Sequence, residues 1–443
     1  MKSLAGLGWC FIAALCMAAP LPAQRGRGGG GFNSSMPPIT GPELPSKLLE
    51  KPSQPPAFSV PVQPLGFSAP GPEYMGKQTS LASLDFLDED HLLFTFRVPG
   101  LIRRAAETGV PGASEERQIR AVLLSLPAGT VEAEALWTLH DRVRYLWMLK
   151  DGHFLLRDGN ALKLGDATLE LKPYLRFPGP LLYLEMDPSQ QFMVADTSEP
   201  AAKTANPGTS TSAATGAGTS LGTSPDKSPA PADLVVRVLR REGGQVMLVS
   251  RTSTAVHLPI NADGILEREH RPGDKWVLNL NLFSGGNTTL GQLDSIRSPG
   301  LDFISQYEIL ATTFPSVAER KLRAIGANGR HLWEYSTYQT TAWPLGQVAA
   351  NSSRLVWEAL VVNPEVSSDT PTLGPDDVKG QLVEVLNAAN GKVALDAPAS
   401  PPLDAGGNVA ISPSGDRVAV IFAGQIQVYN LPPAPPLPEL KAR

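Results

Sequence analysis

Short apolar strands separated by polar turns dominate the chain, and the pattern is clearest in Asn408–Leu431. Val409–Ser412 leads into Pro413–Asp416, where a proline presets the turn and a glycine permits positive φ. Arg417–Phe422 follows, and Gln425–Tyr429 then alternates apolar and polar residues. The segment therefore predicts three antiparallel strands in succession.

The same arrangement of an apolar strand, a polar turn and a second apolar strand recurs upstream. With the last segment included, the turns are centred on Glu89, Gly152, Ser189, Asp263, Gln306, Ser352 and Ser414. A second hairpin with glycine in its turn follows most of them, at Gly129, Gly243, Gly285, Gly329 and Gly391. Once the longer polar insertions are set aside, the turns repeat about every 40–50 residues, the length of a four-stranded propeller blade. The sequence predicts an all-β fold, a β-propeller of about seven four-stranded antiparallel blades.

The last blade lacks a fourth strand of its own, because the proline-rich Pro432–Pro436 cannot donate a ladder of hydrogen bonds. Closing the ring then requires an outer strand from the N-terminal side of the chain. Ala57–Val62 is the candidate, since a proline within it is tolerated on an outermost strand, which is an edge. We expect Phe58 or Val60 to lie beside Gln425–Tyr429.

A two-domain α/β enzyme is the alternative fold. It would need long stretches with apolar residues at i, i+3, i+4 and i+7 between helix caps, and none occurs. Only Glu132–Leu139 has a composition that favours a short helix. The propeller is therefore the predicted fold, with a helix at this segment as its local alternative.

Residues 1–23 have the composition of a secretory signal peptide. A lysine precedes the apolar run Leu4–Ala19, and small residues predict cleavage near Ala23. The run is short for a membrane span, which is the alternative interpretation. Cys10 and Cys16 both lie within it, so the mature chain would contain no disulfide. We expect a secreted protein, periplasmic or extracellular, stabilised by burial alone.

Three stretches fall outside the predicted blades. Residues 24–76 form a Gly/Pro-rich leader that we expect to be mostly disordered apart from the closing strand. Residues 197–232 are rich in Thr, Ser, Ala, Gly and Pro and predict a disordered insertion. Residues 432–443 form a proline-rich tail. The propeller itself would span residues 77–431.

Overall charge and composition exclude some classes of partner. The chain is 42% hydrophobic and 18% charged, an ordinary globular composition, with a formal net charge of −5. No basic surface that would favour nucleic acid or an anionic membrane is indicated.

Two patterns could carry chemistry, but neither has a favourable context. Gly218–Gly222 matches the G-x-S-x-G elbow of α/β-hydrolases, yet it lies in the low-complexity insertion rather than on a strand-to-helix turn. Asp85 and Asp88–Asp90 could offer oxygen ligands to Ca²⁺, but their spacing is not that of an EF-hand loop. Asp302 and Glu308 flank a similar turn. We interpret the acidic residues as exposed turns and the Gly218–Gly222 match as a chance occurrence in the insertion.

The six histidines are His91, His140, His153, His257, His270 and His331, and none is paired at metal-ligand spacing. In a propeller, however, the inner strand of every blade lines the central channel, so residues far apart in sequence can converge there. Two or more carboxylates or histidines within reach of a metal at the channel would favour an enzyme. An apolar or Ser/Thr-lined channel would favour a binding scaffold.

Three segments resemble known propeller families. Asn408–Leu431, with its Ser-Pro-x-Gly turn, resembles a blade of the WD40-like and TolB-like β-propellers. Gly326–Tyr335 and Asn390–Val393 resemble the blade ends of quinoprotein-type propellers. The quinoprotein resemblance implies a quinone stacked on a tryptophan and a vicinal disulfide, next to Ca²⁺. Because the mature chain would lack cysteine, the resemblance implies the fold and not that activity.

The function predicted from these observations is a secreted, non-catalytic binding or scaffold module for a protein, peptide or glycan. We assign no catalytic or metal-ligating residue and no cofactor, and the ligand-binding residues remain open. We expect no nucleic-acid partner, no integral membrane span and a monomeric state. The alternative is a channel-centred enzyme of the lactonase, lyase or glycan-hydrolase type that uses a divalent metal.

Overall fold

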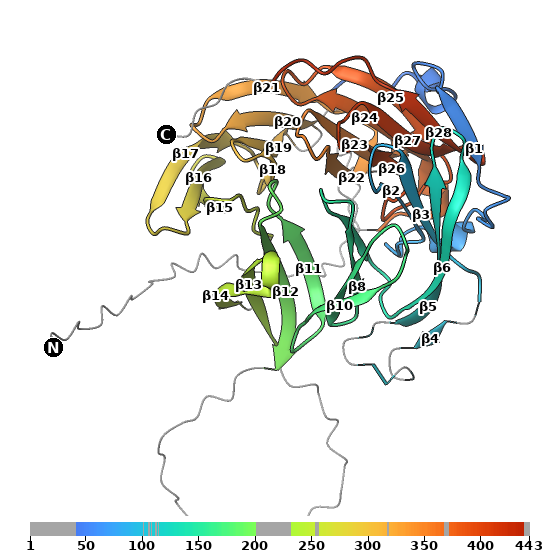
Figure 1. Ribbon diagram of the computed structural model, residues 1–443. Helices are drawn as coiled ribbons and strands as arrows, with labels where there is room; N and C mark the ends of the chain where they lie inside the picture. The colour runs from blue at the N-terminus through green and yellow to red at the C-terminus, as the bar shows by residue number, and fades with distance from the viewer. Residues whose placement is uncertain are drawn as a thin grey trace, which may run out of the picture. The chain divides into compact units, whose positions relative to one another are not determined.

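Seven antiparallel sheets make up the described part of the molecule and are arranged in a ring as the blades of a β-propeller (Figure 1). The computed structural model describes residues 41–437, except 101, 105–106, 108, 111–112, 114, 201–231, 253–256, 317–318 and 367–371. The prediction of a seven-bladed all-β propeller is confirmed.

The first three blades occupy the N-terminal half of the ring. Blade 1 contains β2 (Ala82–Phe86), β3 (His91–Arg97), β4 (Arg103–Arg104), β5 (Glu115–Ser125) and β6 (Thr130–Leu139). Blade 2 contains β7 (Leu146–Met148), β8 (Phe154–Asp158), β9 (Ala161–Gly165) and β10 (Lys172–Arg176). Blade 3 contains β11 (Leu181–Met186), β12 (Phe192–Pro200), β13 (Ala232–Arg240) and β14 (Val246–Thr252).

The remaining four blades complete the ring. Blade 4 contains β15 (Gly264–Arg271), β16 (Lys275–Leu282) and β17 (Asn287–Asp294). Blade 5 contains β18 (Gly300–Ser305), β19 (Glu308–Ser316), β20 (Glu319–Gly326) and β21 (His331–Ser336). Blade 6 contains β22 (Thr341–Val348), β23 (Arg354–Val362), β24 (Val378–Asn387) and β25 (Val393–Ala399). Blade 7 contains β26 (Val409–Ile411), β27 (Arg417–Phe422), β28 (Gln425–Asn430) and β1 (Phe58–Pro61).

Blade 7 closes the ring with the N-terminal strand, as predicted. β1 pairs antiparallel with β28, and its Phe58 and Val60 lie opposite Val428 and Ile426. Val60 is buried in a cluster that joins blade 7 to blade 1 and includes Phe94. The two ends of the propeller are therefore held together by strand pairing and by a shared apolar core.

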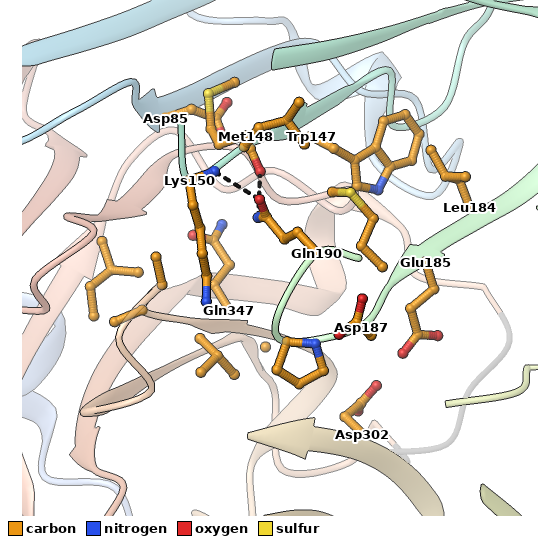
Figure 2. Close-up of a pocket in the computed structure, with 18 of the residues that line it drawn as sticks. Asp85, Trp147, Met148, Lys150, Leu184, Glu185, Asp187, Gln190, Asp302 and Gln347 are labelled. Atoms are coloured by element: carbon orange, nitrogen blue, oxygen red, sulfur yellow. Dashed lines mark hydrogen bonds between the residues drawn. The ribbon is translucent and has the colours of Figure 1, made fainter. Parts of the chain in front are cut away.

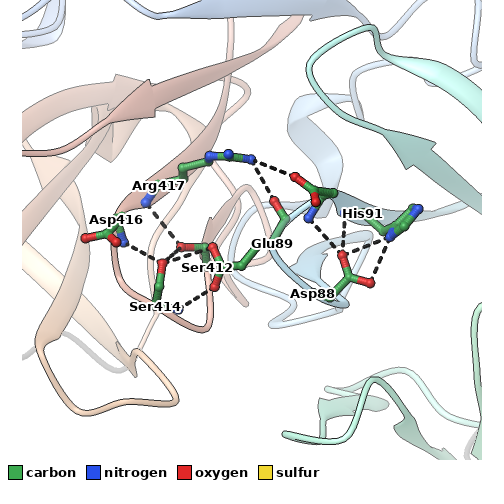
Figure 3. A network of polar contacts seen from close by, with 8 residues as sticks. Asp88, Glu89, His91, Ser412, Ser414, Asp416 and Arg417 are labelled. Carbon is green, nitrogen blue, oxygen red and sulfur yellow. Dashed lines mark hydrogen bonds and ion pairs between the residues drawn. The ribbon is translucent and has the colours of Figure 1, made fainter.

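The turns of blades 7 and 1 are also joined by polar contacts (Figure 3). Ser414 donates from its backbone nitrogen and its hydroxyl to the Glu89 carboxylate, over 2.6 and 2.9 Å. Arg417 donates to the Glu89 carbonyl over 2.7 Å. In the same turn Gly415 has φ 74°, where an added Cβ would lie 2.4 Å from the Ser353 hydroxyl. The Ser-Pro-x-Gly turn therefore connects blade 7 to blade 1.

Two local expectations differ from the structure, which also excludes the helical alternative for Glu132–Leu139. Glu132–Leu139 belongs to strand β6, because pairing with β5 and burial of Trp137 outweigh its helical composition. The insertion begins later than residue 197, since Thr197–Pro200 continue β12 and pair with Val235–Ala232 of β13. In blade 4 the expected strand Val256–Ile260 is reduced to one bridge between Ile260 and Ile265; position 256 itself lies outside the described residues.

The leader packs against the propeller from residue 41 onward, although we expected it to be mostly disordered. The short 3-10 helices η1 (Ser46–Leu49) and η2 (Pro72–Tyr74) lie within it. Leu48 of η1 is buried against Val361 and Leu382 of blade 6. A few leucines among the prolines therefore suffice to hold this stretch on the blade. Two further short 3-10 helices lie outside the leader. η3 (Glu242–Gly244) joins β13 to β14, and η4 (Pro375–Asp377) precedes β24.

Across the part of the chain that the structure describes, no helix is both long and apolar enough to cross a membrane.

Candidate binding site in the central channel

A cavity of about 470 Å³ opens where the inner strands of the ring converge (Figure 2). Six of the seven blades contribute to its lining; representative residues are Asp85, Trp147, Glu185, Asp302, Gln347 and Ile411. This volume lies within the range of small-ligand and side-chain pockets. The channel is therefore a recess with mixed polar and apolar walls.

The inner strands place these side chains by simple alternation. In β18, Leu301 and Phe303 are buried between blades, whereas Asp302 between them is 56% exposed and lines the cavity. In β2, Leu84 is buried and its neighbour Asp85 lines the cavity. Successive strand residues point to opposite faces, so in these two strands an acidic residue facing the channel alternates with residues buried between the blades.

Glu185, His257 and Asp302 converge at one side of the cavity mouth. They come from β11 of blade 3, from the segment before β15 of blade 4 and from β18 of blade 5. His257 Nε2 lies 2.9 Å from Glu185 Oε2 and 3.5 Å from Asp302 Oδ1. Figure 2 shows the two carboxylates facing one another. Glu185 and Asp302 line the cavity and His257 contacts both, so the cluster combines one imidazole nitrogen with two carboxylates.

Tyr183 supports this cluster from within β11. Its hydroxyl donates to Glu185 Oε2, and its ring packs edge-on against His257 with centroids 5.3 Å apart. Burial raises the pKa of Tyr183, and the neighbouring Glu185 charge raises it further. Tyr183 therefore remains a neutral donor that orients the Glu185 carboxylate.

The cluster also perturbs the titration of its members. Desolvation within the channel wall, with the Glu185 charge beside it, raises the pKa of Asp302 to about 7, although His257 opposes the shift. Burial alone would lower the pKa of His257, but the hydrogen bond and charge of Glu185 outweigh it and raise that pKa. The charges within the cluster therefore shift the pKa values of both Asp302 and His257 upward.

Basic side chains come from blade 2, on another part of the lining. Arg144 and Lys150 line the cavity with Trp147, whose ring lies 5.3 Å from the Arg144 guanidinium carbon. The Lys150 backbone nitrogen donates to Gln190 Oε1 over 2.7 Å, which links the β7–β8 turn of blade 2 to the β11–β12 turn of blade 3 (Figure 2). Burial raises the pKa of Asp85, in blade 1, to about 6. The lining thus combines both signs of charge with apolar surface.

The acidic turns noted in the sequence separate into two groups. Asp88 accepts hydrogen bonds from the backbone of Asp90 and His91 and from the His91 ring (Figure 3). With Glu89 engaged by Ser414, that turn is structural. Glu308 is buried beside Ser305. Asp302, which the sequence grouped with exposed turns, instead belongs to the channel cluster.

Other predicted positions do not meet the channel cluster. Gly218–Gly222 lies outside the described residues. His140 contacts Asp158 at 2.7 Å, and His153 contacts Asp151 at 3.2 Å, so each belongs to a separate ion pair of its own. Of the histidines, His257 is the one that the described structure brings to Glu185 and Asp302. The sequence assigned no metal ligand and did not single out Glu185. The position of Glu185 on an inner strand was the sequence signal that could have placed it at the channel.

Comparisons with known proteins agree with the fold. No protein-family model matches the chain, and no curated protein matches it. Similar solved structures include the WD40 domain of Sif2, with 10% identity, TM-score 0.38 and coverage of 80% of this chain and 96% of that one. A putative TolB from Agrobacterium tumefaciens has 11% identity and TM-score 0.36, covering 68% of this chain and 94% of that chain.

A third similar structure is an acylaminoacyl peptidase from Pyrococcus horikoshii, with 12% identity and TM-score 0.44. The match covers 81% of this chain and 52% of the peptidase, so the chain spans about half of that enzyme's length. The β-propeller fold of the chain rests on its own seven sheets, and these structures are what it is similar to. At this level of identity the neighbours carry no argument about activity.

Proposed function

We propose that this protein is an exported binding module whose channel mouth receives a segment of a partner protein. The observation that carries the proposal is the cavity of about 470 Å³ lined by six blades. Leu182 and Val143 are 48% and 39% exposed there, beside basic residues of blade 2 and the carboxylates of blades 3 and 5. An extended peptide offers apolar side chains, charged groups and backbone amides, which suit such a lining.

Substitution of Leu182 by glutamate tests the proposal. Peptides from a random display library, selected on the immobilised full chain, are expected to bind the Leu182→Glu variant at least about tenfold more weakly than the unmodified protein. The added carboxylate removes apolar contact and increases the negative charge near Glu185. Affinity is measured by titration calorimetry or surface plasmon resonance.

Leu136→Glu is the matched control. Leu136 is 58% exposed on β6, the outer strand of blade 1, and does not line the cavity. The same change there should alter affinity by less than about twofold, as expected for a surface substitution. Unchanged affinity of the Leu182→Glu variant for every selected peptide would contradict a binding site at the channel.

Export belongs to the same proposal and is supported by the signal-like residues 1–23. Expression in a bacterial host with this N-terminus should yield a mature protein beginning at Gln24, as read by N-terminal sequencing. Retention of residues 1–23 in the envelope fraction would instead favour a membrane anchor.

A second candidate function is the channel-centred enzyme that uses a divalent metal. The cluster of Glu185, His257 and Asp302 favours it, because two carboxylates and a histidine meet at the channel. Its first requirement is a bound cation.

A further inference from the structure

We propose that Glu185, His257 and Asp302 form a binding site for a transition-metal dication of the Zn²⁺ type, with one coordination position open to the channel. The proposal goes beyond the binding module, because peptide recognition at Leu182 does not require a metal. It concerns three residues from three different blades.

The geometry suits a small dication. One ligand atom from each residue can be chosen so that all three lie within 4.8 Å of one another. Zn²⁺ binds nitrogen and oxygen at about 2.0–2.2 Å, which separates tetrahedral ligands by roughly 3.3–3.5 Å. The separations of 2.9 Å and 3.5 Å from His257 Nε2 lie close to this distance. A cation could therefore enter with only small side-chain movements.

The donor set indicates which metals fit. One imidazole nitrogen with two carboxylate oxygens matches the borderline preference of Zn²⁺ and its neighbours in the first row. Ca²⁺ prefers six to eight oxygen ligands, which these three residues do not supply. The site should thus discriminate in favour of Zn²⁺ or Co²⁺ over Ca²⁺.

The surroundings supply the support expected of a metal ligand. The Tyr183 hydroxyl donates to Glu185 and its ring packs against His257, so two of the three ligands are oriented by the same side chain. Two carboxylates beside one imidazole leave excess negative charge unless protons or a cation occupy the cluster. Arg268 is a nearby positive charge that lowers the pKa of His257. Its Nε donates a hydrogen bond to the Ser298 hydroxyl over 2.6 Å.

The fourth position would face the channel. Asp302 and Glu185 both line the cavity, and Asp302 is more than half exposed to it. Three protein ligands and an open position are the arrangement of catalytic zinc sites, in which the metal binds water or a ligand oxygen. In this protein the open position would take a carboxylate or carbonyl oxygen of whatever enters the channel.

Metal titration of the purified full chain, freed of metal by chelation, tests the site. Calorimetry with ZnCl₂ should show one equivalent bound, and Co²⁺ should give the intense visible absorption of a tetrahedral site. The His257→Ala and Asp302→Asn variants should bind at least about 100-fold more weakly. Tyr183→Phe, which keeps the ring, should lose about tenfold, as outer-shell changes do.

His331→Ala is the matched control, because His331 is exposed on β21 and lies outside the cluster. It should leave affinity and stoichiometry unchanged. Asp302→Asn is nearly isosteric and exposed, so it should retain the fold, which circular dichroism checks. Absence of Zn²⁺ binding, or equal binding by the Asp302→Asn variant, would overturn the metal site. Neither result would affect the peptide-binding test.

Discussion

Val60→Asp is expected to destabilise the propeller by about 3–5 kcal/mol, because it places an unpaired carboxylate in a closed apolar core. Val60 is only 5% exposed and lies in the cluster that joins blades 7 and 1. Its strand pairs with β28, so the substitution acts at the point where the ring closes. The effect is measured as the change in unfolding free energy from urea denaturation.

Ser59→Asp is the control for this prediction. Ser59 neighbours Val60 on the same strand, pairs with Gln427 and is exposed. An aspartate there keeps its water contacts and should change stability by about 0.5 kcal/mol or less. Equal effects of the two substitutions would show that β1 does not close the ring through its buried face.

Glu358→Gln is expected to stabilise the protein at alkaline pH by a few kcal/mol. Glu358 is 2% exposed in β23, and burial raises its pKa to about 8 from an ordinary value of 4.5. The folded state therefore binds more protons than the unfolded state between these values, so stability falls as pH rises from about 4.5 to 8. Glutamine carries no charge and can still accept the hydrogen bond from Gln381.

The pH profile separates this effect from a general change in packing. Urea unfolding of the Glu358→Gln variant should match the unmodified protein near pH 5 and exceed it near pH 8.5. The exposed Glu267→Gln should show no such gain. Burial also raises the pKa of Glu384 to about 8, so a smaller slope of the same sign should persist. A constant difference at all pH values would contradict a neutral, buried Glu358.

The fold was predictable because its hairpins repeat along the chain and because proline cannot donate to a strand ladder. Each hairpin turn carries a polar signal, most often glycine, proline, aspartate, asparagine or serine, so the seven turns could be located one at a time. The assignment of residues 58 and 60 to the last blade followed from Pro432–Pro436, which cannot form a fourth strand. Local composition alone was misleading where tertiary packing decides the structure. Trp137 holds β6 in the strand form, and leucines such as Leu48 hold the leader on blade 6.

The channel cluster was not predictable by spacing. Glu185, His257 and Asp302 belong to three blades, and their proximity depends on the curvature of the ring, which no local pattern records. Asp302 appeared to be one more acidic residue near a turn, and Glu185 one more alternating position in a strand. Channel-facing positions of the repeat include Glu185 and Asp302, whereas His257 precedes the first strand of its blade. To recognise the three residues as candidate metal ligands, the distances between their side chains in the structure were also needed.

Peptide binding at the channel mouth is tested most directly by locating a bound peptide on the protein. A photoreactive benzoylphenylalanine placed at Leu182, in the channel, and in a separate variant at Leu136, on the outer strand of blade 1, would report contact with a selected peptide. If the peptide binds at the channel mouth, position 182 should cross-link efficiently and position 136 should not. Cross-linking from position 136 alone would contradict it, because the ligand would then bind the outer edge of the ring.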